Sequence, residues 1–181
     1  MNRFVGFVGF VVLSLLAIGM QIPPQVHAQV QSPSQTPKAD VQASIEAGKG
    51  PYSATADAGA DVRQALEQAR KNHKAVLVFF GANWCEDCRS LARALELPRN
   101  ATLMAQDFNV VKVDVGNFDR NLDVVDQLGG PIARGIPAAV LLSPGGDIRY
   151  STKAGELSTA RRMSAEGVYE FFEHLLVDAE G

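Results

Sequence analysis

The strongest fold signal in the sequence is the stretch Ala75-Val76-Leu77-Val78-Phe79-Phe80-Gly81-Ala82-Asn83-Trp84-Cys85-Glu86-Asp87-Cys88. Residues 75–80 form an unbroken apolar run that is rich in branched and aromatic side chains. A strand that is apolar on both faces is typical of the centre of a parallel sheet, where helices cover both sides. Gly81 ends the run, and we predict that a helix begins at about Cys85. The first cysteine is therefore expected where a buried strand turns into a helix.

Helices and strands are predicted to alternate on either side of this junction. Helices are expected over residues 57–72, 85–95 with a continuation after Pro98 to position 104, and 119–128. Strands are expected at 109–115, 138–142 and 148–152, with a hairpin turn at 143–147 between the last two. Ser164 is a good N-cap for a final helix, whose buried stripe is expected to contain Val168, Phe171, Phe172 and Leu175. This order predicts an α/β fold with a mixed central sheet and helices on both of its faces.

The N-terminal residues have the layout of a secretory signal. Arg3 supplies a positive start, residues 4–20 are uncharged and almost wholly apolar, and Val26-His27-Ala28 resembles a signal-peptidase site. We therefore predict a signal peptide over residues 1–28, cleaved after Ala28, and a periplasmic location for the mature chain. The alternative is an uncleaved membrane anchor. A helix that spans a bilayer needs roughly 20 apolar residues, and the run over residues 4–20 is at the short limit of that length.

The region after the signal is poor in bulky apolar side chains. Residues 29–53 are rich in Gln, Ser, Pro, Ala and Gly, so they are predicted to form a flexible linker. The remaining residues, 54–181, are predicted to form one domain. The formal net charge is −3, and no cluster of Lys and Arg suggests a nucleic-acid partner. The pair Arg161-Arg162 is interpreted as a solvated turn.

The chain has two cysteines, Cys85 and Cys88. A disulfide across this short spacing closes a very small loop and constrains little of the unfolded chain, so a structural role is a poor interpretation. A helix N-terminus favours a thiolate at Cys85, and Cys88 lies one turn further on, within reach of it. The exposed first sulfur is expected to attack a substrate disulfide, and the second to resolve the mixed disulfide. A structural zinc needs about four ligands, so we predict no metal and no cofactor apart from the cysteine pair itself.

The stretch from Val78 to Cys88 resembles the active-site stretch of the thioredoxin family, and Gly135-Ile136-Pro137 resembles that family's cis-proline segment. The resemblance covers residues 57–176 and implies a thioredoxin fold. It also implies that Cys85 is the nucleophile, Cys88 the resolving cysteine and Pro137 a cis-proline beside them. By the same resemblance, the backbone of Ile136 pairs with an extended substrate, and Trp84 belongs to the substrate-binding surface.

Two positions depart from the pattern of that family. Many thioredoxins have a buried acidic residue six positions before the first cysteine, where this chain has Phe79. The residues between the cysteines are Glu86 and Asp87, two carboxylates that we interpret as modulating the site. Negative charge disfavours a thiolate, and strong oxidants of this fold stabilise their thiolate form. These neighbours therefore predict a protein that acts in the reducing direction.

In layout the domain is similar to the periplasmic thioredoxin-like domain that ends the transmembrane reductase DsbD, and to free-standing exported relatives. The resemblance implies a monomeric disulfide reductase that acts on exported client proteins. With no third cysteine for internal relay, it would take electrons from a membrane-embedded thiol donor. Two other interpretations remain: a disulfide oxidase or isomerase, and a non-catalytic binding module of thioredoxin fold.

Overall fold

The computed structural model describes residues 50–179. The predicted signal peptide and residues 29–49 of the predicted linker lie outside the described residues. In the part of the chain that is described, no helix is both long and apolar enough to cross a membrane.

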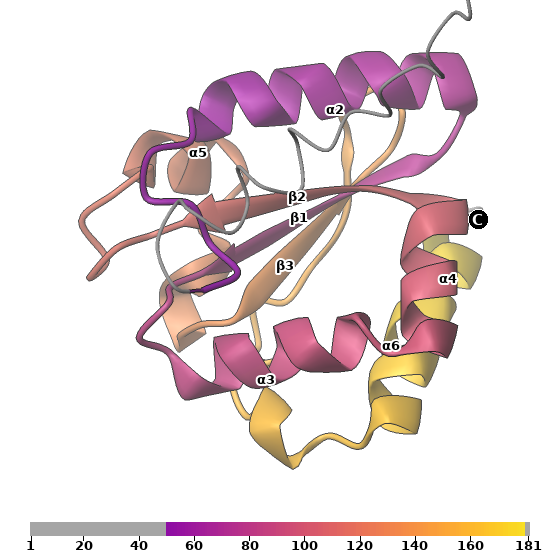
Figure 1. The fold of residues 1–181 in the computed structure, drawn as a ribbon. Helices are drawn as coiled ribbons and strands as arrows, with labels where there is room; N and C mark the ends of the chain where they lie inside the picture. The colour runs from indigo at the N-terminus through magenta and orange to yellow at the C-terminus, as the bar shows by residue number, and fades with distance from the viewer. Residues whose placement is uncertain (1–49, 180–181) are drawn as a thin grey trace, which may run out of the picture. The chain divides into compact units, whose positions relative to one another are not determined.

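A four-stranded mixed sheet forms the middle layer of the domain (Figure 1), with strand order β2-β1-β3-β4. The central strand β1 (Ala75–Gly81) pairs in parallel with β2 (Phe108–Asp114) and antiparallel with β3 (Ala138–Leu142). Strand β4 (Ile148–Ser151) completes the hairpin with β3. Every residue of β1 after Ala75 is buried, as its continuous apolar sequence predicted. The mixed sheet is confirmed.

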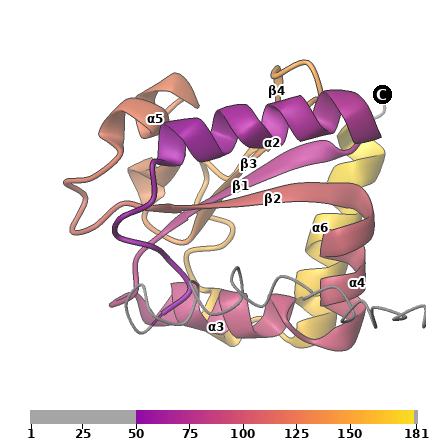
Figure 2. The same cartoon turned by 45° about the horizontal axis from the view of Figure 1, so that its top comes forward.

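Helices cover both faces of this sheet (Figure 2). Helices α2 (Ala58–Asn72) and α5 (Leu122–Gln127) lie on one face. Helices α3 (Glu86–Leu95), α4 (Pro98–Asp107) and α6 (Ala165–Ala179) lie on the other. Alternate residues of β1 contribute to the two apolar layers, so Val78 and Phe80 pack toward α2 while Leu77 and Phe79 pack toward α6. The predicted thioredoxin fold is confirmed.

Several helix ends differ from the prediction for local reasons. Pro98 begins α4 as a separate helix, since proline at the first helical position has no N–H that needs a partner. The helix predicted over 119–128 is shorter, because Asn121 has a left-handed backbone, and the 3₁₀ helix η1 (Pro131–Arg134) follows α5. The predicted cap of α6 is confirmed, with Ser164 Oγ accepting a hydrogen bond from the Gly167 N–H at 3.0 Å. Val168, Phe172 and Leu175 are buried as predicted, and Phe171 is partly buried.

The domain includes residues that we predicted as the end of the linker. Tyr52 is buried, and its ring lies against Gly81 where a Cβ atom would otherwise stand. The Tyr52 N–H donates to Asn83 Oδ1 at 3.0 Å, and Asn83 Nδ2 donates to the Tyr52 carbonyl at 2.7 Å. Polar and small neighbours hide this tyrosine from a composition argument, so the linker boundary predicted at residue 53 was placed too late.

Candidate active site

The two cysteines lie at the start of α3, joined in a disulfide. Cys85 is the N-cap residue, with an extended backbone, and the Cys88 N–H points at its sulfur with an N-to-Sγ distance of 3.1 Å. Free N–H groups and the helix dipole at this end both favour negative charge on that sulfur. Cys85 is 6% exposed and Cys88 is fully buried. Both cysteines are therefore buried in this structure, and Cys85, whose sulfur we expected to be exposed, is only slightly more accessible than Cys88.

A segment distant in sequence completes the surroundings of Cys85. The η1 helix ends at Gly135, where φ is +105°, and the next peptide bond, Ile136–Pro137, is cis. The carbonyl oxygen of Ile136 lies 3.6 Å from Cys85 Sγ. The structure therefore brings the backbone of Ile136 beside Cys85, and the cis-proline Pro137, also singled out from the sequence, directly follows it.

Trp84 forms an aromatic pair with a residue that we did not identify from the sequence. Trp84 is 55% exposed, its Nε1 donates to the Gly116 carbonyl at 2.8 Å, and its ring meets Phe118 edge-to-face with 6.1 Å between centroids. Phe118 is 44% exposed and has a left-handed backbone with φ of +64°. Its one sequence signal is that it is an aromatic residue in the otherwise polar stretch 116–121. Trp84 is the residue directly before Cys85 in the sequence, so the exposed Trp84–Phe118 pair lies next to the start of the cysteine motif.

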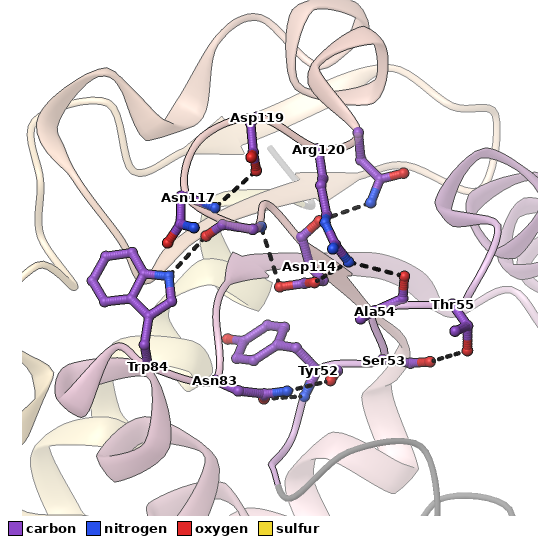
Figure 3. Close-up of polar contacts among 12 residues, drawn as sticks. Tyr52, Ser53, Ala54, Thr55, Asn83, Trp84, Asp114, Asn117, Asp119 and Arg120 are labelled. Carbon is purple, nitrogen blue, oxygen red and sulfur yellow. Dashed lines mark hydrogen bonds and ion pairs between the residues drawn. The ribbon is translucent and has the colours of Figure 1, made fainter.

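Hydrogen bonds to Asp114 hold the loop after β2, whose Gly116 carbonyl accepts the hydrogen bond from Trp84 (Figure 3). The buried carboxylate of Asp114 accepts from the Gly116 N–H at 3.2 Å and lies 3.7 Å from Arg120 Nη1. Asn121 Nδ2 donates to the Asp114 carbonyl at 2.7 Å, and Arg120 donates to the Ala54 carbonyl at 3.2 Å. The loop is thereby connected both to the end of β2 and to the segment before α2.

Tyr52 lies next to this network (Figure 3). Burial raises the pKa of Tyr52 above its ordinary value of 10.0, and the negative charge of Asp114 raises this pKa further. Its hydroxyl therefore stays neutral over the physiological pH range. Tyr52 was also missed by the sequence analysis, which placed it in the linker.

The two carboxylates between the cysteines are paired with a cation. Asp87 is buried, and its carboxylate accepts from the Arg161 backbone N–H at 2.9 Å and from Arg161 Nη1 at 3.2 Å. Glu86 Oε2 lies 3.5 Å from the same Nη1. Arg161 belongs to the 3₁₀ helix η2 (Ala160–Arg162) and is exposed, in keeping with a solvated turn, but its contacts with two carboxylates were not predicted from the sequence. The negative charge that we expected beside the sulfurs is partly compensated.

The position of the missing acid is filled by apolar packing. Phe79 is buried and meets Phe172 edge-to-face, with 5.4 Å between ring centroids. Among the described residues, the buried acidic side chains are Asp87 and Asp114. Asp87 is therefore the buried carboxylate next in sequence to Cys88.

Neither histidine of the domain contributes to this site. His73 ends α2 with a left-handed backbone, and His174 is exposed on α6 with Nδ1 2.6 Å from the Glu170 carbonyl oxygen. Within residues 50–179, no group of three or more His, Cys, Asp or Glu side chains could hold a metal ion.

Comparison with known proteins agrees with this geometry. The family model of thioredoxin-like proteins matches residues 57–144. A disulphide isomerase from Xylella fastidiosa Temecula1 is 49% identical, with 70% of this chain and 97% of that one covered and a TM-score of 0.69. The C-terminal domain of Neisseria meningitidis DsbD in its reduced form is 22% identical, with 64% and 95% covered and a TM-score of 0.46. No match was found among curated proteins.

The match at 49% identity spans nearly the whole Xylella protein, so it shows more than a shared fold. The prediction of a thiol–disulfide oxidoreductase of thioredoxin-like type is confirmed at that level by the family model, this relative and the Cys85–Cys88 disulfide. The chain therefore belongs to the thioredoxin-like family.

Proposed function

We propose that this protein is an exported reductase that reduces disulfides of client proteins in the periplasm through Cys85 and Cys88. The observation that carries the proposal is the placement of Cys85 at a helix start, with the Ile136 carbonyl oxygen 3.6 Å from its sulfur. An extended client segment that hydrogen-bonds to the backbone of Ile136 would present its own sulfur to Cys85. The Trp84–Phe118 pair offers an apolar surface for side chains that flank the client cysteine.

The reaction has two exchange steps. The Cys85 thiolate attacks one sulfur of the client disulfide, forms a mixed disulfide and releases the other client sulfur, which takes up a proton. The Cys88 thiol then loses its proton and attacks Cys85 Sγ, forming the Cys85–Cys88 disulfide and releasing the second client thiol. Two electrons and two protons have passed from the cysteine pair to the client.

A further thiol protein must restore the dithiol form. The whole chain holds two cysteines, and both are consumed in one round of reduction. We propose that a membrane-embedded thiol donor supplies the next two electrons, and that the protein works as a monomer without a metal or organic cofactor. The signal peptide predicted from the sequence of residues 1–28 would direct the chain to the compartment where such a donor acts.

The Xylella relative gives a reason to retain a second candidate function. That protein is described as a disulphide isomerase. In isomerisation Cys85 would attack a wrong disulfide, a free client thiol would displace it, and no net electrons would pass. The same pair of cysteines supports either outcome, so the direction must be measured.

Two assays on the mature chain test the proposal. We expect the wild-type protein to reduce insulin in the presence of dithiothreitol, and Cys85→Ser to abolish the reaction. A wild type that reshuffles scrambled ribonuclease but leaves insulin oxidised would instead support the isomerase. Inactivity in both assays would support a binding module that uses its disulfide as a clasp.

Client trapping addresses the substrates directly. In Cys88→Ala the resolving thiol is absent, so mixed disulfides on Cys85 should accumulate and be identified by mass spectrometry of the periplasmic fraction. Cys85→Ser is the matched control, because it removes the attacking sulfur. Covalent partners that are equally abundant in both variants would count against Cys85 as the nucleophile.

A further inference from the structure

We propose that Arg161 is a positioning residue for redox chemistry: its guanidinium compensates Glu86 and Asp87 and thereby adjusts the reducing power of the cysteine pair. This inference rests on the proposed exchange reaction of Cys85 and Cys88. It concerns a residue that lies 74 positions from Asp87 in the chain and outside the stretch that resembles the thioredoxin active site.

The geometry joins Arg161 to the site by two independent contacts. Its backbone N–H donates to Asp87 Oδ1 at 2.9 Å, and its guanidinium donates to Asp87 Oδ2 at 3.2 Å. The same Nη1 atom lies 3.5 Å from Glu86 Oε2. Asp87 is buried and lies between the two cysteines in the sequence. Arg161 belongs to η2, so the cation reaches the Glu86-Asp87 dipeptide from a separate element of the fold. One cation is therefore shared by both carboxylates.

The charge balance at the helix start explains what this cation does. Acidic residues in the first turn stabilise α3 through its dipole, but they disfavour a thiolate at Cys85. A guanidinium beside them removes part of that penalty while the carboxylates stay in the first turn of α3. Stabilising the thiolate stabilises the reduced form of the pair, which makes the protein a weaker reductant. Arg161 thus moderates the reducing tendency that Glu86 and Asp87 would otherwise impose.

Because one contact with Asp87 comes from the backbone of Arg161 and the other from its side chain, a substitution can remove the positive charge and keep the backbone contact. Substitution of the side chain in Arg161→Gln leaves the backbone N–H free to bind Asp87 Oδ1, so η2 remains attached to α3. The Arg161 side chain is 46% exposed, so its truncation opens no buried cavity. Arg161→Lys restores the positive charge without the planar guanidinium. The side chain of Arg162, on the same short helix, makes no hydrogen bond or ion pair among the described residues, and Arg162→Gln makes the same change in net charge.

The test is equilibration of each variant of the mature protein with glutathione buffers at about pH 8, where thiolate forms are populated. Arg161→Gln should shift the equilibrium toward the protein disulfide by roughly twofold to fivefold, the range of a partly exposed charge pair. The pH at which half of Cys85 absorbs as a thiolate should rise in the same variant. Arg161→Lys should return most of the shift, and Arg162→Gln should leave the equilibrium within error of wild type.

Two outcomes would overturn the inference. Equal shifts in Arg161→Gln and Arg162→Gln would show an effect of net charge alone. An unchanged equilibrium in Arg161→Gln, with unchanged urea stability, would show that the guanidinium does not act on the sulfurs. Insulin reduction by the wild type reports the proposed function separately, since the glutathione equilibrium can be measured whether or not a client is reduced.

Discussion

The side chains around Cys85 differ in what they supply to the site. Arg161 and Asp87 act on charge, while Trp84 and Phe118 supply exposed aromatic area. Phe118 is held with φ of +64°, a backbone conformation that L-residues with large side chains rarely adopt. Such strain persists only where the surroundings impose it and is concentrated at functional sites. The position of Phe118 is therefore consistent with a role in meeting the client.

Removing the aromatic surface should weaken recognition of proteins and spare the chemistry. We expect Phe118→Ala to raise the KM for insulin by about twofold to tenfold, because aromatic contacts contribute roughly 0.5–1.5 kcal/mol beyond their area. Turnover of a small disulfide, such as glutathione disulfide, should change less, because it has far fewer groups than a protein client to place against Phe118. Leu97→Ala, which alters an exposed apolar side chain before α4, is the matched control. Equal losses with insulin and with the small disulfide would contradict a docking role.

Among the elements, the segment that contains Tyr52 connects several parts of the site. It lies against the end of β1 at Gly81, bonds to Asn83 just before Trp84, and accepts a hydrogen bond from Arg120 at Ala54. Its contacts therefore reach both the strand that precedes the cysteines and the loop that holds Trp84. Loss of this segment should loosen the aromatic surface as well as the core.

The raised pKa of Tyr52 predicts a loss of stability at alkaline pH. Below about pH 10 the tyrosine is neutral in both states and its burial contributes fully. Above that pH the unfolded chain ionises Tyr52 while the folded protein resists ionisation, so stability falls by up to about 1.4 kcal/mol per pH unit. Urea denaturation between about pH 8 and pH 11 should show this fall in wild type and a shallower one in Tyr52→Phe. An equal slope in both proteins would refute the assignment to Tyr52.

The domain as a whole has two apolar layers, one on each face of the sheet, and the cysteines belong to only one of them. Cys85 and Cys88 pack with the layer under α2 and α5, whereas Phe79 packs with α6 in the other. Phe79, at the position where many thioredoxins have an acid, therefore packs in the second apolar layer against Phe172. The departure from the family pattern at this position has a clear effect on packing.

Substitution of two phenylalanines compares the stability contributed by a core residue, Phe79, with that contributed by a surface residue, Phe118. Phe79→Ala should lower the free energy of unfolding by about 3–5 kcal/mol, the usual cost of truncating a buried phenylalanine. Phe118→Ala should lower it by no more than about 1.5 kcal/mol, because the residue is 44% exposed and its ring pairs with the exposed ring of Trp84. Urea denaturation monitored by circular dichroism measures both. Similar losses in the two variants would contradict the assignment of Phe79 to the core and Phe118 to the surface.

Local patterns in the chain were sufficient to predict the main elements and the placement of the cysteines. The apolar run of β1, the break at Gly81 and the cap at Ser164 depend on neighbours within a few residues, so periodicity and capping chemistry predict them. The short 3₁₀ helices and the division of the helix at Pro98 were harder to predict from the sequence, because one left-handed residue or one proline determines where a helix ends. Roles for Trp84, Ile136 and Pro137 came from the family resemblance and remain predictions.

Long-range contacts were decided only by the tertiary structure. Arg161 reaches Asp87 across 74 positions, Tyr52 packs on Gly81, and Phe118 lies beside Trp84. None of these contacts has a local sequence signal, because each depends on how the sheet order and the helix packing bring distant segments together. The cysteine pair and the direction of its helix could therefore be predicted from the sequence alone. Its charge balance and its client-facing surface depend on residues that only the folded chain brings to it.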